Sequence, residues 1–230
     1  AYRVRFVTAA SLFDGHDAAI NIIRRLLQAS GAEVIHLGHN RSVAEIVDAA
    51  VQEDVQGIAV SSYQGGHTEF FSYMIDMLHE RNRPDIRVFG GGGGVIVEEE
   101  IKALHNYGVS RIYSPGDGQH LGLQGMIDDM LERADFYPAE QPSESIEGLN
   151  DPEGVRLARV LTEIENGTIS EFLIRQIRAA VTRSKEHAPV LGITGTGGSG
   201  KSSLTDEFIL RLRIDYGDAL RIAVLAVDPT

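Results

Sequence analysis

The fold is indicated by residues 2–31, which have the sequence YRVRFVTAASLFDGHDAAINIIRRLLQASG. Residues 2–8 form a short apolar run typical of a strand, and residues 17–30 follow with apolar side chains at helical spacing. These side chains are Ile22, Ile23, Leu26 and Leu27. Ser30 and Gly31 then supply a normal helix C-terminal signal. A strand followed by a helix is the repeating unit of an α/β fold.

The same strand-then-helix unit occurs five times within residues 1–136. Strands are expected at residues 2–8, 33–37, 56–61, 86–90 and 111–113, and helices at 17–30, 42–53, 67–82, 96–107 and 119–133. Ser42 and Glu45 have the spacing of a capping box at the start of the second helix. The alternation predicts a doubly wound, flavodoxin-like parallel sheet with right-handed crossovers. Ligands bind such sheets outside the carboxyl ends of the strands.

A candidate metal ligand follows the first strand, in the sequence Asp14-Gly15-His16. An Asp two positions before a His can accept the proton on Nδ1 and leave Nε2 for a metal. Asp and His are also ordinary loop residues, so the pair alone does not establish a site. Its place at the functional edge of the sheet favours one. A zinc site is disfavoured because no second or third protein ligand is visible nearby.

Two further loops reach the same edge. Ser61, Ser62 and Tyr63 follow the third strand, and five glycines follow the fourth, among them Gly91, Gly92 and Gly93. Consecutive glycines cost backbone entropy, so a flat ligand lying against the backbone is one explanation and a flexible loop is the other. The serine hydroxyls could receive a phosphate or a base nitrogen, or could be turn residues. Nearby His67 could approach such a ligand, but a hydrated surface histidine is the expected interpretation.

The composition changes after residue 136. Residues 137–188 begin with a polar stretch rich in Pro, Ser and Glu and continue with two helical patterns at 152–166 and 170–184. We interpret them as a linker and packing helices.

A phosphate-binding motif follows, G-x-x-x-x-G-K-[ST], with strands expected at 190–194 and 222–227 and a helix from residue 203. Its candidate nucleotide-binding residues are Gly195, Thr196, Gly197, Gly198, Ser199, Gly200, Lys201, Ser202 and Ser203. Lys201 would reach the β and γ phosphates as the catalytic cation. Ser202 and Asp228 would hold Mg²⁺.

The motif does not separate GTP from ATP. One strand, one helix and one strand are also too few to close a nucleotide site. Residues 189–230 are therefore expected to be the incomplete start of a P-loop domain, in the front part of a longer protein.

The composition excludes several classes of protein. A net charge of −12 disfavours binding to nucleic acid or to anionic membranes. No apolar run in the sequence approaches the length of a membrane span. Disulfides and thiolate metal sites are ruled out because the chain has no cysteine, which suits the cytoplasm.

With these motifs identified, residues 1–136 resemble the cobalamin-binding domain of acyl-CoA mutases. The resemblance rests on Asp14-Gly15-His16, on residues 60–63 and on the glycines before Val95. The motif of that family, D-x-H-x-x-G, has Ala19 in place of its glycine, which puts tight helix packing there in doubt. The last part of the chain resembles the G-protein chaperones of such mutases. The domain order resembles that of the fused isobutyryl-CoA mutases.

The resemblance implies an isomerase that interconverts isobutyryl-CoA and n-butyryl-CoA with adenosylcobalamin, and a GTP hydrolase for cofactor loading that uses Mg²⁺. It makes His16 the lower axial ligand of cobalt with Asp14 behind it. It places the nucleotide tail of the cofactor among Ser61, Tyr63 and the glycines. It also implies an acyl-CoA substrate held by a barrel outside this chain, and a homodimer. Two alternatives stay open: a methylmalonyl-CoA type of mutase, and a non-catalytic chaperone or sensor that binds cobalamin and nucleotide.

Overall fold

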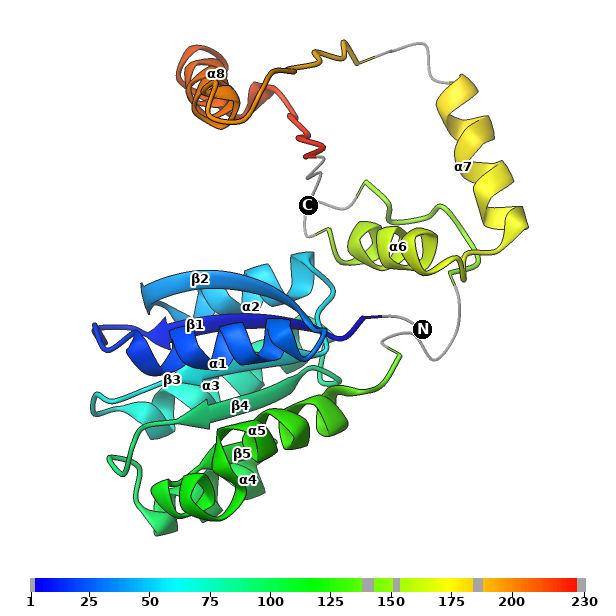
Figure 1. Cartoon of the computed structure of the whole chain (residues 1–230). Helices are drawn as coiled ribbons and strands as arrows, with labels where there is room; N and C mark the ends of the chain where they lie inside the picture. Colours follow the sequence, from blue (N-terminus) through cyan, green and yellow to red (C-terminus); the bar gives the residue numbers. More distant parts are fainter. Residues whose placement is uncertain (1–2, 138–142, 151–153, 184–187, 227–230) are drawn as a thin grey trace. The chain divides into compact units, whose positions relative to one another are not determined.

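The computed structural model describes residues 3–137, 143–150, 154–183 and 188–226. The chain divides into two compact units, residues 1–181 and residues 182–230, and each is described by itself. Figure 1 shows the elements in chain order. No helix in the described ranges is both long enough and apolar enough to cross a membrane.

The first unit is built on a five-stranded parallel sheet in the order β2-β1-β3-β4-β5. The strands are β1 (Arg5–Ser11), β2 (Glu33–Arg41), β3 (Gly57–Ser61), β4 (Arg87–Gly91) and β5 (Arg111–Tyr113). This order is that of flavodoxin-like doubly wound sheets. In these sheets β2 is added on one side of β1 and the later strands on the other, so the strand order reverses between β1 and β3. The predicted fold class is confirmed.

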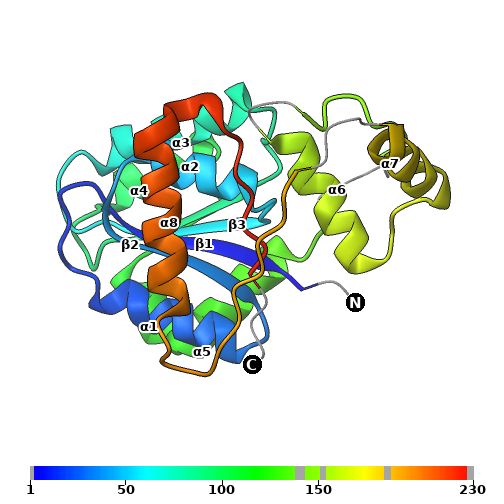
Figure 2. The same ribbon diagram turned by 90° about the horizontal axis from the view of Figure 1, so that it is seen from above.

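Helices cover both faces of the sheet (Figure 2). They are α1 (Ala18–Ala29), α2 (Val43–Gln52), α3 (His67–Glu80), α4 (Glu98–Tyr107) and α5 (Pro115–Ala134). One face carries α1 and α5 over a core that includes Phe6, Phe89 and Ile127. The other face carries α2, α3 and α4 over the larger core, which includes Ile58 and Phe71. All five strands therefore end at one edge, between two covered faces.

Some element boundaries differ from the prediction. The second strand continues to Arg41, and the first runs from Arg5 to Ser11, because their pairing is maintained through two register shifts. Helix α5 begins at Pro115, four residues earlier than predicted, because Ser114 caps it and Asp117 completes a capping box. Gly122 then interrupts the helix with a φ of 66°. The capping box of α2 is confirmed.

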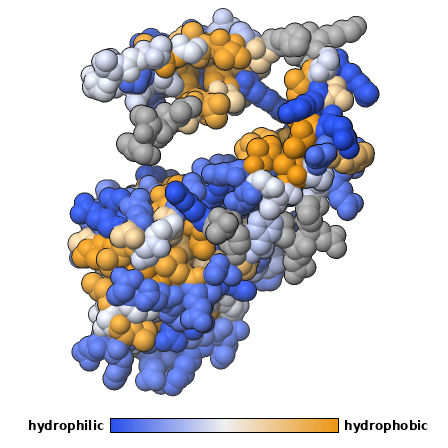
Figure 3. Space-filling model, turned by 45° about the vertical axis from the view of Figure 1, so that its right-hand side comes forward, coloured by the Kyte–Doolittle hydropathy of each residue, from blue (hydrophilic) through white to orange (hydrophobic). Residues whose placement is uncertain are grey.

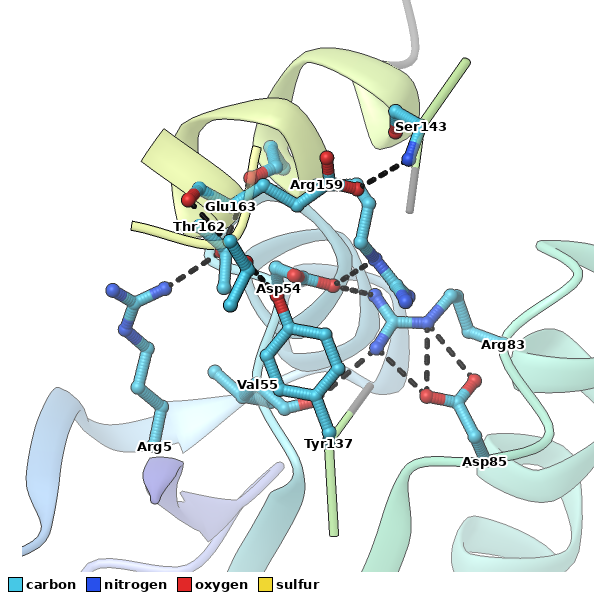
Figure 4. A network of polar contacts seen from close by, with 12 residues as sticks. Arg5, Asp54, Val55, Arg83, Asp85, Tyr137, Ser143, Arg159, Thr162 and Glu163 are labelled. Carbon is cyan, nitrogen blue, oxygen red and sulfur yellow. Dashed lines mark hydrogen bonds and ion pairs between the residues drawn. The ribbon is translucent and has the colours of Figure 1, made fainter. Parts of the chain in front are cut away.

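Two more helices follow in the stretch predicted to be linker and packing helices, α6 (Val155–Asn166) and α7 (Glu171–Arg183). Helix α6 packs against α2 at the edge of the sheet where the strands begin. Its Arg159 Nε lies 3.2 Å from Oδ1 of Asp54, and Nη1 of Arg83 lies 2.9 Å from the same oxygen (Figure 4). Both contacts are ion pairs whose geometry does not meet that of a hydrogen bond. The other carboxylate oxygen of Asp54, Oδ2, has no hydrogen-bond partner in the described ranges.

Arg83 is the centre of this network, with a side chain that is only 2% exposed. It also donates to the carbonyl of Val55 and to both carboxylate oxygens of Asp85. A second link runs from Arg5 at the start of β1 to Thr162 of α6, at 2.9 Å. A buried guanidinium needs this number of acceptors, because a charge without partners is strongly destabilising away from water.

The second unit contains α8 (Lys201–Tyr216) and a 3-10 turn, η1 (Gly217–Ala219). The strands expected at 190–194 and 222–227 are not formed over their described residues, because a parallel strand needs a paired neighbour and neither segment pairs here. Large apolar side chains of α8 are exposed, such as Phe208 at 45% and Ile214 at 65%. Figure 3 shows where hydrophobic and hydrophilic residues lie on one face of the protein.

The buried network generates a stability prediction. We expect Arg83→Ala to lower the free energy of unfolding by about 3–5 kcal/mol, because it leaves Asp54 and Asp85 without their shared partner. The measurement is urea unfolding followed by circular dichroism. The control is Arg175→Ala, which breaks an exposed pair with Glu171 and should cost less than about 0.5 kcal/mol. Equal effects of the two variants would contradict the prediction.

Candidate functional site

The Asp14 carboxylate is fully buried at the carboxyl edge of the sheet, with 0% of the residue exposed. Oδ1 accepts from the backbone N–H of His16 at 2.8 Å and lies 2.9 Å from His16 Nδ1. Oδ2 accepts from the backbone N–H of Tyr63 at 2.6 Å. Burial alone would raise the pKa of Asp14, but the hydrogen bonds from Tyr63 and His16 outweigh it, and the net pKa is lowered. The group is therefore an anion held by three donors.

The His16 ring is turned outward from this anchor, with a side chain that is 70% exposed. Because Nδ1 faces Asp14, the free nitrogen is Nε2, which has no hydrogen-bond partner in the described part of the chain. The Tyr63 ring lies beside it, with centroids 5.6 Å apart. An imidazole held through Nδ1 by a carboxylate is the usual arrangement of a histidine metal ligand. Within the described ranges, no group of three His, Asp or Glu side chains could hold a bare metal ion.

A mainly apolar cavity of about 330 Å³ opens beside Tyr63, which is one of its lining residues. Its volume is within the usual size range of small-molecule sites. The strand ends contribute the residues that the sequence singled out, Ser61, Tyr63, Gly91, Gly92 and Gly93. The other walls come from α1 and α5. The structure thus brings the three predicted loops together, with Asp14, Gly15 and His16 in the loop after β1.

The helix walls were missed by the sequence analysis. They include Ala19 and Ile22 from α1, and Leu123, Met126 and Met130 from α5. Ala19, which replaces the glycine of the usual motif, lies directly on the cavity. The sequence did contain one indication of the α1 wall, because the apolar stripe of the first helix includes Ile22. In the structure this side chain is 49% exposed and lines the cavity.

The glycines after β4 are required first by the protein's own atoms. A Cβ on Gly92 would lie 2.2 Å from the carbonyl oxygen of Ser62, and one on Gly93 would lie 2.5 Å from the Tyr63 ring. Gly93 also has a φ of 57°, which favours glycine. A Cβ on Gly91, by contrast, would lie at an ordinary van der Waals distance, 3.5 Å from the carbonyl oxygen of Tyr113. The run is an ordered turn, and its glycines allow two loops to touch.

The two predicted serines have different environments. Ser62 is paired, since its Oγ accepts from Ser11 Oγ at 3.1 Å and its N–H donates to the carbonyl of Gly91 at 2.8 Å. Ser61 Oγ is buried on the cavity wall and has no hydrogen-bond partner in the described part of the molecule. A buried hydroxyl without a partner is costly, so this atom is suited to a polar group of a ligand.

His67 is buried, and its expected role as a hydrated surface histidine is wrong. Its ring lies between the turn after β3 and the start of α4, with Nε2 2.9 Å from Glu100 Oε2. Spacing in the sequence could not show this contact, because the two residues lie 33 positions apart.

The predicted phosphate loop in the second unit precedes α8, whose N-cap residue is Gly200 with a φ of 82°. Lys201 Nζ donates to the carbonyl of Thr196 at 2.7 Å, so the side chain lies over the loop. Gly195 through Gly198 are exposed, and Ser202 and Ser203 lie in the first turn of the helix. Helix N-termini with free N–H groups bind phosphate. The predicted Mg²⁺ ligand Asp228 lies outside the described residues.

Comparison with known proteins finds a separate match for each part of the chain. Residues 4–117 match the model of the B12 binding domain, and residues 157–230 match that of the methylmalonyl Co-A mutase-associated GTPase MeaB. All 230 residues align at 58% identity with a fused isobutyryl-CoA mutase from Cupriavidus metallidurans, covering 21% of that protein. A fused isobutyryl-CoA mutase from Geobacillus kaustophilus is 59% identical over 238 residues, with 100% of this chain and 22% of the relative covered.

The chain belongs to the fused isobutyryl-CoA mutase family. It spans about a fifth of the length of these two relatives. The 2-hydroxyisobutanoyl-CoA mutase small subunit from Aquincola tertiaricarbonis is also similar to it, at 33% identity over 109 residues, which cover 47% of this chain and 79% of that subunit.

Three observations show that the cavity fits a cobalamin. His16 offers one free ring nitrogen, and its ring lies beside Tyr63, which lines the cavity. Ser61 Oγ lacks a partner inside the cavity. Gly91 leaves the wall open at β4, where a side chain would project. An apolar cavity with few polar groups suits the flat base of a nucleotide tail.

The glycine turn generates a matched pair of predictions. We expect Gly92→Ala to lower the free energy of unfolding by about 1–3 kcal/mol, because its Cβ would overlap the Ser62 carbonyl and the loops would have to separate. Gly91→Ala should cost less than about 1 kcal/mol, because its Cβ meets only ordinary contacts. Urea unfolding of the ligand-free protein provides the measurement. If the two variants were equally stable, this account of the glycine run would be wrong.

Proposed function

We propose that this chain is the cofactor-binding and nucleotide-binding part of an adenosylcobalamin-dependent mutase that interconverts isobutyryl-CoA and n-butyryl-CoA. The observation that carries the proposal is the Asp14–His16 pair beside a cavity that contains a buried hydroxyl without a partner. When bound, adenosylcobalamin supplies the radical for the carbon-skeleton rearrangement by homolysis of its cobalt–carbon bond.

The residues of the first unit have separate tasks in this proposal. His16 Nε2 would bind the cobalt of the cofactor. Asp14 fixes the ring orientation and accepts the proton on Nδ1, since hydrogen bonds from the N–H groups of Tyr63 and His16 hold its carboxylate as an anion. Ser61 would hydrogen-bond the base of the nucleotide tail, and Tyr63, Gly92 and the apolar faces of α1 and α5 would exclude water around it.

In the second unit, the loop at 195–200 would hold the phosphates of GTP or GDP on the N-terminus of α8. Lys201 would leave the Thr196 carbonyl for the β and γ phosphates, and Ser202 would ligate Mg²⁺ with Asp228. GTP hydrolysis would serve the loading or protection of the cofactor. The preference for GTP rests on the similarity of residues 157–230 to a GTPase family.

Three parts of the proposal rest on similarity to relatives. The first is the acyl specificity: identity is 58–59% to fused isobutyryl-CoA mutases and 30% over 128 residues to a methylmalonyl-CoA mutase from Mus musculus. The second is a substrate-binding barrel outside these 230 residues. The third is a homodimer. A cytoplasmic location is proposed on a separate ground, since a chain without cysteine suits a reducing compartment.

The axial ligand can be tested by spectroscopy. We expect His16→Ala to weaken adenosylcobalamin binding by at least about tenfold and to change the visible spectrum of the bound cofactor, because cobalt loses a nitrogen ligand. Binding is followed by absorbance titration of the full-length protein. His79→Ala is the matched control, an exposed histidine in the last turn of α3. Unchanged affinity and spectrum in the His16 variant would refute the assignment.

The nucleotide site can be tested independently. Lys201→Ala should abolish detectable binding of GTP and GDP while leaving cobalamin affinity unchanged, because the lysine contributes only to the phosphate loop. Both ligands are titrated into the same preparation of the full-length protein, with fluorescent GTP and GDP for the nucleotide. Arg211→Ala, on the exposed side of α8 with a pair to Glu207, is the control. Retained nucleotide binding by the lysine variant would exclude the assigned role.

A further inference from the structure

A buried histidine lies behind the cavity wall without touching the cavity. His67 is the first residue of α3 and is 6% exposed. Its Nε2 lies 2.9 Å from Glu100 Oε2, and its Nδ1 lies 3.3 Å from the carbonyl oxygen of Gln64. The ring therefore contacts the turn after β3 through one nitrogen and the start of α4 through the other.

Glu100 extends this contact to Val97, the N-cap residue of α4, which follows the glycine run. Its Oε2 also accepts from the backbone N–H of Val97 at 2.9 Å. The pKa of Glu100 is lowered by the hydrogen bond from Val97 and then by the one from His67. Both donors thus act on a carboxylate, which makes the hydrogen bonds charge-assisted and stronger than neutral ones.

The two segments joined by this pair carry the walls of the proposed cobalamin site. On the β3 side, Gln64 adjoins Tyr63, whose N–H holds Asp14. On the β4 side, Ile96 precedes Val97 and lies against Gly92, where an added Cβ would be 3.1 Å from its Cγ1. The loops touch at the cavity through Tyr63 and Gly93. The contact between His67 and Glu100 joins the same two segments at a point that does not line the cavity.

We propose that His67 and Glu100 form a positioning pair for the cobalamin site. They set the separation of the turns after β3 and β4, and so the placement of Tyr63 and Gly92 around the nucleotide tail. Neither side chain lines the cavity. This inference rests on the proposed function and assigns it two residues that act through their neighbours.

A bond that only stabilises the fold would behave differently, and the protein provides the comparison. Tyr107 of α4 donates its hydroxyl to both carboxylate oxygens of Asp76 of α3, at 2.9 and 3.0 Å. This contact joins the same two helices as His67 and Glu100 do, but near their C-terminal ends, away from the cavity. Tyr107→Phe therefore removes an α3–α4 hydrogen bond without disturbing the turns.

The experiment measures adenosylcobalamin affinity by absorbance titration in the full-length protein. We expect His67→Ala and Glu100→Ala each to weaken binding about tenfold, the lower end of the range for residues that orient a ligand. The spectrum of the saturated complex should stay that of wild type, because His16 is intact. His67→Gln keeps a donor toward Glu100 and should restore most of the affinity. Tyr107→Phe should bind as wild type does.

Two results would overturn the inference. One is binding within about twofold of wild type in the alanine variants. The other is an equal loss in Tyr107→Phe, which would show that any weakening of the α3–α4 contact has this effect. If His67→Ala does not fold, Glu100→Ala decides the question, because its side chain is 38% exposed and its removal leaves no cavity in the core. A wild-type protein that binds no cobalamin would instead refute the proposed function, and this inference with it.

Discussion

The organisation of the first unit depends on one buried anion, the Asp14 carboxylate. A carboxylate without water is stable only if donors surround it, and the three donors here come from two loops that lie 49 positions apart in the chain. Satisfying Asp14 therefore brings the loop after β1 against the loop after β3. The same requirement orients the His16 ring and positions Tyr63 beside it. The orientation of this candidate metal ligand is therefore a consequence of burying a charge.

The glycine run follows from this arrangement. Tyr63 is held by its own N–H, so the turn after β4 must accommodate its ring, and Gly93 does so at a distance where no Cβ fits. Gly92 lets the backbone approach Ser62 in the same way. Both glycines are needed before any ligand arrives. The cavity is thereby formed in advance, which spares a ligand the cost of ordering the walls.

The sequence predicted most of the fold, because alternating apolar patterns and caps such as Ser42 with Glu45 are local signals. It also predicted which loops meet, because parallel strands end at one edge. It could not predict the burial of His67 or the wall formed by Met126 and Met130, since these depend on packing between distant segments. The strands expected at 190–194 and 222–227 were wrong over their described residues for a related reason: an apolar run specifies a strand only where a neighbour pairs with it.

The two edges of the sheet have opposite characters. The carboxyl edge presents an open cavity with one unpaired hydroxyl, whereas the amino edge is closed by α6 through Asp54, Arg83 and Arg159. Residues 157–166 match the MeaB model in sequence, yet they pack on the B12-binding domain. A boundary drawn from family similarity is therefore different from a boundary drawn from packing. The buried charges explain why, since withdrawing Arg159 would leave Asp54 with one partner fewer in a site that excludes water.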